Sequence, residues 1–201
     1  MARRPKTFLT PEQYLEIERK AEFKSEYYGG EMFAMSGARR FHNLINWNLA
    51  RTLDRHLRNR PCEAYQNDMR VRVNATGLYA YPDTVVVCGE PQFLDETQDT
   101  LLNPTVIVEV LSPSTEAYDR GGKFELYRAI PSLNYHLLVS SERMSAELFT
   151  RQAEGGWLLT GATLPEDTID LPAVGVRFTL ADLYEKVEFV YKAPGMRPLQ
   201  S

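Results

Sequence analysis

The sequence predicts an α/β fold in which a mixed central β-sheet is flanked by helices. Residues 105–111, TVIVEVL, form an almost continuously apolar run, which is typical of a central strand covered on both faces. A helical segment follows and ends before Pro131, and LNYHLLV at 133–139 then predicts a second buried strand. Because strands precede and follow this helix, we expect helices packed on one mixed sheet.

Length and composition favour one globular domain. The chain has 201 residues, 43% of them apolar, which is enough to bury a substantial core. We expect residues 1–192 to form the domain and residues 193–201, with two prolines and a glycine, to form a loose tail. The net charge of -4 argues against a nonspecific nucleic-acid binder. It leaves a DNA partner open, because carboxylates can hold a cation that meets phosphate.

The sequence carries no signal for export or for a membrane. The basic residues of MARRPKTFLTPEQ are not followed by the apolar core of a signal peptide, and no run of about 18 apolar residues predicts a membrane span. Cys62 and Cys88 are too few for a disulfide framework, and each lies in or beside an apolar segment where a reduced thiol can pack. We therefore expect a cytoplasmic protein with free thiols and no membrane partner.

The N-terminal part is expected to form a helix and a β-hairpin. TPEQ at 10–13 has the spacing of an N-cap, a first-turn proline and a capping-box glutamine, so a helix should extend to about residue 21. Tyr14 and Ile17 are expected on its inner face. The paired glycines of KSEYYGGEMFAMS, at 24–36, then predict a tight hairpin turn.

A long helix is predicted from residue 41 to about residue 60, where Pro61 ends it. Its apolar stripe recurs every four residues, at Phe41, Ile45, Leu49, Leu53 and Leu57.

Two strands and a loop are predicted next. Alternating apolar residues predict a strand through AYQNDMRVRV at 64–73, with Arg70 and Arg72 on the opposite face. Residues 78–88 are expected to form the following strand, and the polar segment 89–103 a surface loop. Near the C-terminus, MSAELFT and GGWLLTG predict two strands, and Thr179 is expected to begin a short helix.

Glu109 and Asp83 are the acidic residues most in need of an explanation. Burying an isolated carboxylate in the middle of TVIVEVL would cost several kcal/mol unless something compensates it. Metal coordination is one explanation, and a buried ion pair with Lys123 or an arginine is the other. Asp83 follows Pro82 in YPDTVVV, where an aspartate can cap a turn or belong to a site.

Lys123 is the candidate cation. It lies four residues after Asp119 and four before Tyr127, so all three should share one face of a helix that starts near Ser114. An exposed Asp–Lys pair is the alternative. The two glycines of DRGGK cost a helix about 1 kcal/mol each relative to alanine, which favours close approach by another backbone or by a substrate.

These motifs together resemble a known family. PD at 82–83, EVLSPST at 109–115 and D-x-x-x-K-x-x-x-Y at 119–127 are similar to the Uma-two (Uma2) family of restriction endonucleases, part of the PD-(D/E)xK nuclease superfamily. The similarity covers about residues 10–140. It also includes Glu26, Gly30, His42, Asp68 and the strand NYHLLVS. The resemblance implies a restriction-endonuclease-like core preceded by an N-terminal helix and a β-hairpin.

The resemblance also implies a metal site. In it Asp83 and Glu109 bind Mg²⁺, or alternatively Mn²⁺, and the backbone carbonyl of Val110 adds a ligand. Carboxylate oxygens suit Mg²⁺, which keeps several waters. Such an ion polarises a phosphoryl oxygen and lowers the pKa of a bound water, while Lys123 orients that water or neutralises developing charge.

The sequence departs from the superfamily pattern at two places. Leu111 occupies the third position of the E-x-K element, so the lysine must come from the following helix, where Lys123 stands. His136 and Ser140 stand where relatives commonly have Trp and Asp, in a strand that we expect to be structural.

Several residues are weaker candidates. Glu26, His42 and Asp119 are expected as accessory residues near the metal, although capping or packing is the alternative for His42. Arg70, Arg72 and Arg120 could contact phosphate, but scattered arginines are usually solvated surface, so they stay outside the predicted site.

The leading functional prediction is a metal-dependent endonuclease that hydrolyses phosphodiester bonds in DNA, working as a homodimer so that two sites address two strands. The alternative is a catalytically inactive nuclease fold that binds nucleic acid or protein. RNA stays open as a substrate because the phosphodiester chemistry is shared. The sequence identifies neither a recognition site nor a partner protein.

Overall fold

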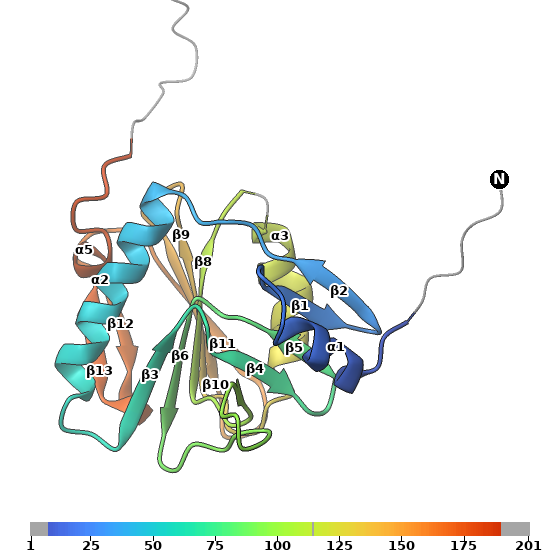
Figure 1. The fold of residues 1–201 in the computed structure, drawn as a ribbon. Coiled ribbons are helices and arrows are strands. Elements are labelled where there is room, and N and C mark those ends of the chain that lie inside the picture. Colours follow the sequence, from blue (N-terminus) through green and yellow to red (C-terminus); the bar gives the residue numbers. More distant parts are fainter. Residues whose placement is uncertain (1–7, 114, 190–201) are drawn as a thin grey trace, which may run out of the picture.

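The computed structural model describes residues 8–113 and 115–189 (Figure 1). The tail predicted at 193–201 and the helix start predicted near Ser114 lie outside the described residues. Within the described ranges no helix is long and apolar enough to cross a membrane.

The central sheet is mixed, as predicted, with strand order β11-β10-β9-β8-β6-β3. Its strands are β3 (Cys62–Gln66), β6 (Thr84–Cys88), β8 (Val106–Leu111), β9 (Tyr135–Ser140), β10 (Ala146–Arg151) and β11 (Trp157–Ala162). The β8 and β9 strands are parallel, and the other neighbouring pairs are antiparallel. Every residue of β8 is buried, which confirms the prediction of a covered central strand.

A second sheet packs beside the first, with strand order β2-β1-β5-β4-β7. Its strands are β1 (Ser25–Tyr28), β2 (Glu31–Ala34), β4 (Arg70–Val73), β5 (Leu78–Ala80) and β7 (Thr100–Leu101). The predicted hairpin is β1–β2, and the glycines of its turn have φ angles of 59° and 86°. A two-stranded ribbon of β12 (Thr168–Leu171) and β13 (Val176–Thr179), joined by the 3-10 turn Pro172–Val174, was not predicted.

The helices cover the sheets unequally. They are α1 (Pro11–Glu18), α2 (Arg40–Leu57), α3 (Glu116–Tyr118), α4 (Phe124–Tyr127) and α5 (Leu180–Leu183), and the π-helical turn η1 (Asp119–Lys123) joins α3 to α4. Figure 1 shows α2 beside α5 and the β12–β13 ribbon, with α3 on the other side of the central strands, near β1 and β2. The predicted capping box of α1 and the Thr179 N-cap of α5 are both present.

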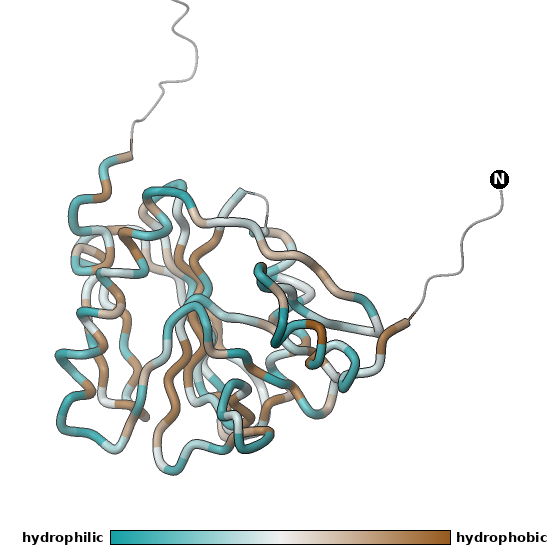
Figure 2. The backbone as a smooth tube through the Cα atoms, viewed as in Figure 1, coloured by the Kyte–Doolittle hydropathy of each residue, from teal (hydrophilic) through white to brown (hydrophobic). Residues whose placement is uncertain are grey.

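Two apolar cores lie on opposite faces of the central sheet. One contains the predicted stripe of α2 from Ile45 to Leu57 together with α5 and the ribbon. The other joins β4 and β5 of the small sheet to β6, β8 and Tyr127. Figure 2 shows hydrophobic residues concentrated along the central strands. The α3–α4 segment therefore packs between the two sheets.

Two predicted strands are each divided between the sheets, which corrects the sequence reading. Residues 78–88 form β5 and β6, and Pro82 lies at the break, because proline supplies no N–H to a ladder. Residues 64–73 likewise divide, near Asn67, which adopts a φ of 57°. The Asn67 N–H donates to the Asp83 carbonyl at 3.0 Å, so the two breaks lie against each other. The predicted loop 89–103 contains β7.

Two further predictions were wrong. Cys62 and Cys88 are joined in a disulfide rather than free, because the antiparallel register of β3 and β6 places them directly opposite each other. On α1, Ile17 is 45% exposed, and Leu15 joins Tyr14 on the inner face instead.

Candidate active site

Lys123 connects the two sheets through ion pairs. Its Nζ lies 2.8 Å from Oε1 of Glu26 on β1 and 3.0 Å from Oε1 of Glu109 on β8. Oδ1 of Asp119, in the same π turn, is 3.6 Å away. All four side chains are at most 10% exposed, so the alternative of a solvated Asp–Lys pair is wrong. The Lys123 ammonium therefore contacts one acid from each of three elements: Glu26 from β1, Glu109 from β8 and Asp119 from the π turn.

The π turn contains two adjacent glycines, and only at Gly122 would a larger side chain crowd a neighbour. A Cβ on Gly122 would lie 3.2 Å from the nearest atom of the Tyr118 ring, whereas a Cβ on Gly121 would meet nothing within 4 Å. Gly122 therefore lets the tyrosine ring lie against the backbone beside Lys123. The predicted close approach of another backbone or a substrate is not what the structure shows: the neighbour of Gly122 is the side chain of Tyr118, and among the described residues Gly121 has no close neighbour.

The carboxyl of Glu109 has an unusual environment. Burial raises its pKa to about 8; the Lys123 ammonium opposes this rise, and the charges of Asp119, Asp83 and Glu26 add to it. The hydroxyl of the buried Tyr127 donates to Oε1 of Glu109 at 3.1 Å. Oε1 of Glu109 is therefore contacted by two donors, the Lys123 ammonium and the Tyr127 hydroxyl.

Lys123 stays charged in this cluster. Burial alone would lower the pKa of its ammonium, but Glu109, Tyr127 and Glu26 outweigh burial and raise the pKa well above the ordinary value. Burial likewise raises the pKa of Asp119, against the influence of Lys123.

Asp83 lies between β5 and β6, where three polar groups contact its carboxylate. Its Oδ2 accepts the Val110 N–H at 2.7 Å. Its Oδ1 lies 3.1 Å from Nε2 of His42 and 3.3 Å from Nδ2 of Asn46, both on α2. His42 therefore contacts the predicted metal ligand instead of capping its helix. The sequence reading missed Asn46, although a polar residue one turn after His42, beside an apolar stripe, was the available signal.

Comparison with known proteins places the chain in a family. The family model Uma2, described as "Putative restriction endonuclease", matches residues 11–181. The chain belongs to the Uma-two family. An uncharacterized protein of Synechocystis sp. is 37% identical over 181 residues, covering 90% of this chain and 94% of its own length. A second uncharacterized Synechocystis protein is 38% identical over 152 residues, covering 76% and 86%.

A solved structure shares the fold. The crystal structure of "a putative nuclease belonging to DUF820" from Anabaena variabilis superposes with a TM-score of 0.72. The likeness covers 88% of this chain and 97% of that chain at 16% sequence identity, and it confirms the predicted restriction-endonuclease-like architecture.

Leu111, which stands where the superfamily pattern has lysine, is buried in this Uma-two protein. The Leu111 side chain is 2% exposed, and its carbonyl accepts hydrogen bonds from the N–H and hydroxyl of Ser141. Position 111 is thus enclosed beside β9. The ammonium near Glu109 comes from Lys123, as the sequence reading expected of the following helix.

The backbone carbonyl of Val110 points toward Asp83. A strand residue's N–H and C=O point to the same side, and the Val110 N–H donates to Asp83. The Leu111 carbonyl points the other way, to Ser141 of the β9 side. Because β6 pairs with β8 only up to Val108, the Val110 carbonyl lies past the end of that ladder.

The donors in this region fit a hard divalent cation. Glu26, Glu109 and Asp119 bring three carboxylates around Lys123, and repulsion from Asp119, Asp83 and Glu26 contributes to the raised pKa of Glu109. Among the described residues no three Asp, Glu, His or Cys side chains form a ready metal cage. Mg²⁺ needs no such cage, since it usually binds one or two carboxylates and keeps its waters.

The remaining candidates lie elsewhere. Arg70 is buried, not solvated, and its guanidinium bonds Asp99, Thr100 and Tyr81. Arg120 pairs with Glu116 and Glu147. His136 is stacked on Phe124 at 5.2 Å, and burial lowers its pKa to about 3, which agrees with a structural strand.

Proposed function

We propose that this Uma-two protein is a metal-dependent endonuclease that hydrolyses phosphodiester bonds in DNA, with Asp83, Glu109 and Lys123 as its catalytic residues. The observation that carries the proposal is the 3.0 Å contact between Lys123 Nζ and Glu109, made although Leu111 fills the usual lysine position. Family membership and the nuclease fold of the Anabaena protein support the same reaction class.

Asp83, Glu109 and the Val110 carbonyl would hold the metal, Mg²⁺ or Mn²⁺. When bound, the ion supplies Lewis-acid polarisation of the phosphoryl group and a more acidic water. The protein must keep those oxygens correctly oriented. His42 and Asn46 do this for Asp83, and the Tyr127 hydroxyl does it for Glu109.

Lys123 acts as a fixed positive charge. Its raised pKa keeps it protonated at neutral pH, so it is a poor proton acceptor. An ammonium beside Glu109 instead stabilises negative charge that develops on the phosphate during attack. Because Glu26 and Asp119 hold the ammonium in place, it needs little reorganisation during the reaction.

We also propose that residues 1–192 act as one endonuclease domain, as a homodimer in the cytoplasm. Disulfides are rare in reducing compartments, so the Cys62–Cys88 disulfide argues against this location. Cell fractionation tests the location directly. Sedimentation of the purified chain tests the dimer.

Cleavage assays test the central proposal. Supercoiled and single-stranded circular DNA are incubated with the protein and Mg²⁺, Mn²⁺ or EDTA. Nicking should require the metal and should be lost in Asp83→Ala, Glu109→Ala and Lys123→Met. Lys20→Met removes an exposed lysine that pairs with Glu16; it is the matched control and should cut normally. Cleavage that survives in Asp83→Ala or Glu109→Ala would overturn the assignment.

The alternative is an inactive nuclease fold, favoured by one observation. Lys123 already neutralises part of the acidic cluster through three ion pairs. In that case Mn²⁺ would not raise the melting temperature, whereas a functional site should show a Mn²⁺-dependent rise that Asp83→Asn abolishes.

A further inference from the structure

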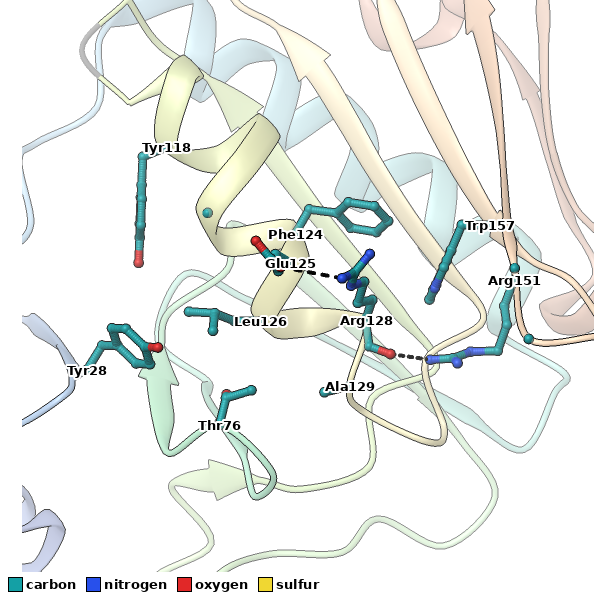
Figure 3. Close-up of a pocket in the computed structure, with 13 residues that line it drawn as sticks. Tyr28, Thr76, Tyr118, Phe124, Glu125, Leu126, Arg128, Ala129, Arg151 and Trp157 are labelled. Atoms are coloured by element: carbon teal, nitrogen blue, oxygen red, sulfur yellow. Dashed lines mark hydrogen bonds and ion pairs between the residues drawn. The ribbon is translucent and has the colours of Figure 1, made fainter.

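An open groove of about 980 Å³ lies beside the candidate active site (Figure 3). Its walls come from the α3–α4 segment, the end of β1 and the turn between β10 and β11. None of the roles proposed above for Asp83, Glu109 and Lys123 uses this groove. Its volume is at the upper end of the range of about 300–1,000 Å³ found for small-ligand sites.

The groove shares two elements with the Lys123 cluster. Tyr118 precedes Asp119, and the centre of its ring is 6.0 Å from Lys123 Nζ. Tyr28 follows Glu26 by two residues on β1, so both side chains leave the same face of the strand. A ligand that contacts these two tyrosines is therefore next to the acids that Lys123 pairs.

The two tyrosine rings are available to a ligand. Tyr28 is 41% exposed and Tyr118 is 43% exposed. Figure 3 shows both on one side of the groove, with Trp157 and Arg151 on the opposite side. Gly122 leaves the space in which the Tyr118 ring lies, so this ring has a defined position.

The opposite side supplies positive charge. The Arg151 guanidinium stacks 4.5 Å over Trp157 and donates to the carbonyls of Arg128 and Ile130, so it is held in place. The Arg128 side chain is 53% exposed, and its ion pair is a 3.4 Å contact with the more exposed Glu125. A surface pair of this kind contributes little and can yield to a phosphate.

Aromatic rings that face an exposed arginine suit a ligand with flat rings and phosphates. In a paired duplex the base faces are stacked on one another, so only an unpaired strand can present them to Tyr28 and Tyr118. We propose that the groove binds an unpaired stretch of the DNA strand next to the cleavage site, with bases stacked on the two tyrosines and a phosphate on Arg128. The proposal rests on the nuclease function proposed above.

Binding in EDTA tests the groove separately from cleavage. Fluorescence anisotropy follows the intact protein with a labelled oligothymidine, with the matching duplex and with an abasic strand of equal length. The wild type should prefer the oligothymidine. Tyr28→Leu and Tyr118→Leu should each raise its Kd roughly 5- to 100-fold, as expected for loss of one base–aromatic stack. Tyr28→Phe and Tyr118→Phe keep the ring and should bind normally.

A control variant and a double-mutant-type comparison of protein ring and DNA base complete the test. Phe23→Leu removes a ring that is 74% exposed and lies outside the groove, so binding should not change. On the abasic strand the Tyr→Leu variants should bind as the wild type does, because the stacking partner is already gone. Equal binding of oligothymidine by wild type and both Leu variants would overturn the groove proposal. So would a tighter complex with the duplex.

The outcome distinguishes this proposal from the catalytic one. Ring-dependent binding without cleavage in Mg²⁺ would support the groove and overturn the nuclease assignment. Metal-dependent cleavage with no effect of either tyrosine substitution on binding would support the nuclease assignment and overturn the groove proposal. Tighter binding of oligouridine RNA than of DNA would overturn the choice of DNA as occupant.

Discussion

Replacing Glu109 with glutamine should remove a pH-dependent loss of stability. The folded protein holds the Glu109 proton up to a pKa of about 8, whereas the unfolded chain releases it near 4.5. Stability contributed by this group is therefore complete at low pH and falls as the pH rises between those values. Each pH unit in that window costs about 1.4 kcal/mol, so the whole range amounts to at most about 5 kcal/mol.

Glutamine keeps the shape of the side chain and has no proton to lose. Lys123 retains Glu26 at 2.8 Å and Asp119 at 3.6 Å, so its charge stays paired in Glu109→Gln. We expect the free energy of unfolding of the variant, relative to the wild type, to rise by about 3–4 kcal/mol from pH 5 to pH 8.

Urea unfolding followed by the fluorescence of Trp47 and Trp157 measures this difference. Glu125→Gln makes the same chemical change on α4, where the side chain is 71% exposed, so it is the control and should run parallel to the wild type. If the Glu109→Gln and wild-type curves differ by less than about 1 kcal/mol in their pH dependence, the raised pKa and the reasoning from it are refuted.

Three further results are expected. Lys123→Met leaves the buried acids Glu26 and Asp119 without their ammonium, so the free energy of unfolding should fall by about 3–5 kcal/mol at pH 7, measured by urea titration. Dithiothreitol should lower the stability by about 2–4 kcal/mol through the Cys62–Cys88 disulfide, and a Cys62→Ser variant should not respond. Gly122→Ala should displace the Tyr118 ring and weaken oligothymidine binding in the anisotropy assay, whereas Gly121→Ala, with open space around its Cβ, should leave binding unchanged.

The central part of the fold could be predicted because local patterns and tertiary environment agree there. Val106 to Leu111 is apolar except at Glu109 and is buried on both faces, and the stripe of α2 has one period throughout. The division of residues 78–88 between two sheets was not predictable from alternation, because both halves are apolar. Pro82 was the local signal, but only the packing decides that the chain changes sheets there.

The contact between Glu109 and Lys123 in the candidate site could be predicted from the sequence, but the residues that hold the neighbouring Asp83 could not. A carboxylate in a buried strand needs a partner, so Glu109 was visible from the sequence alone. Asn46 was not, because its role depends on where α2 lies relative to Asp83. The disulfide was missed for the same reason, because the register that places Cys62 opposite Cys88 depends on how β3 pairs with β6 in the folded chain.

The position of Lys123 between β1 and β8 bears on when the protein becomes competent during folding. Its partners Glu26 and Glu109 belong to different sheets, and the π turn that carries it packs between them. A chain in which only one sheet has formed holds at most part of the acidic cluster. The proposed cutting centre is therefore complete only when both sheets have formed and docked, so a chain with one sheet folded would lack it.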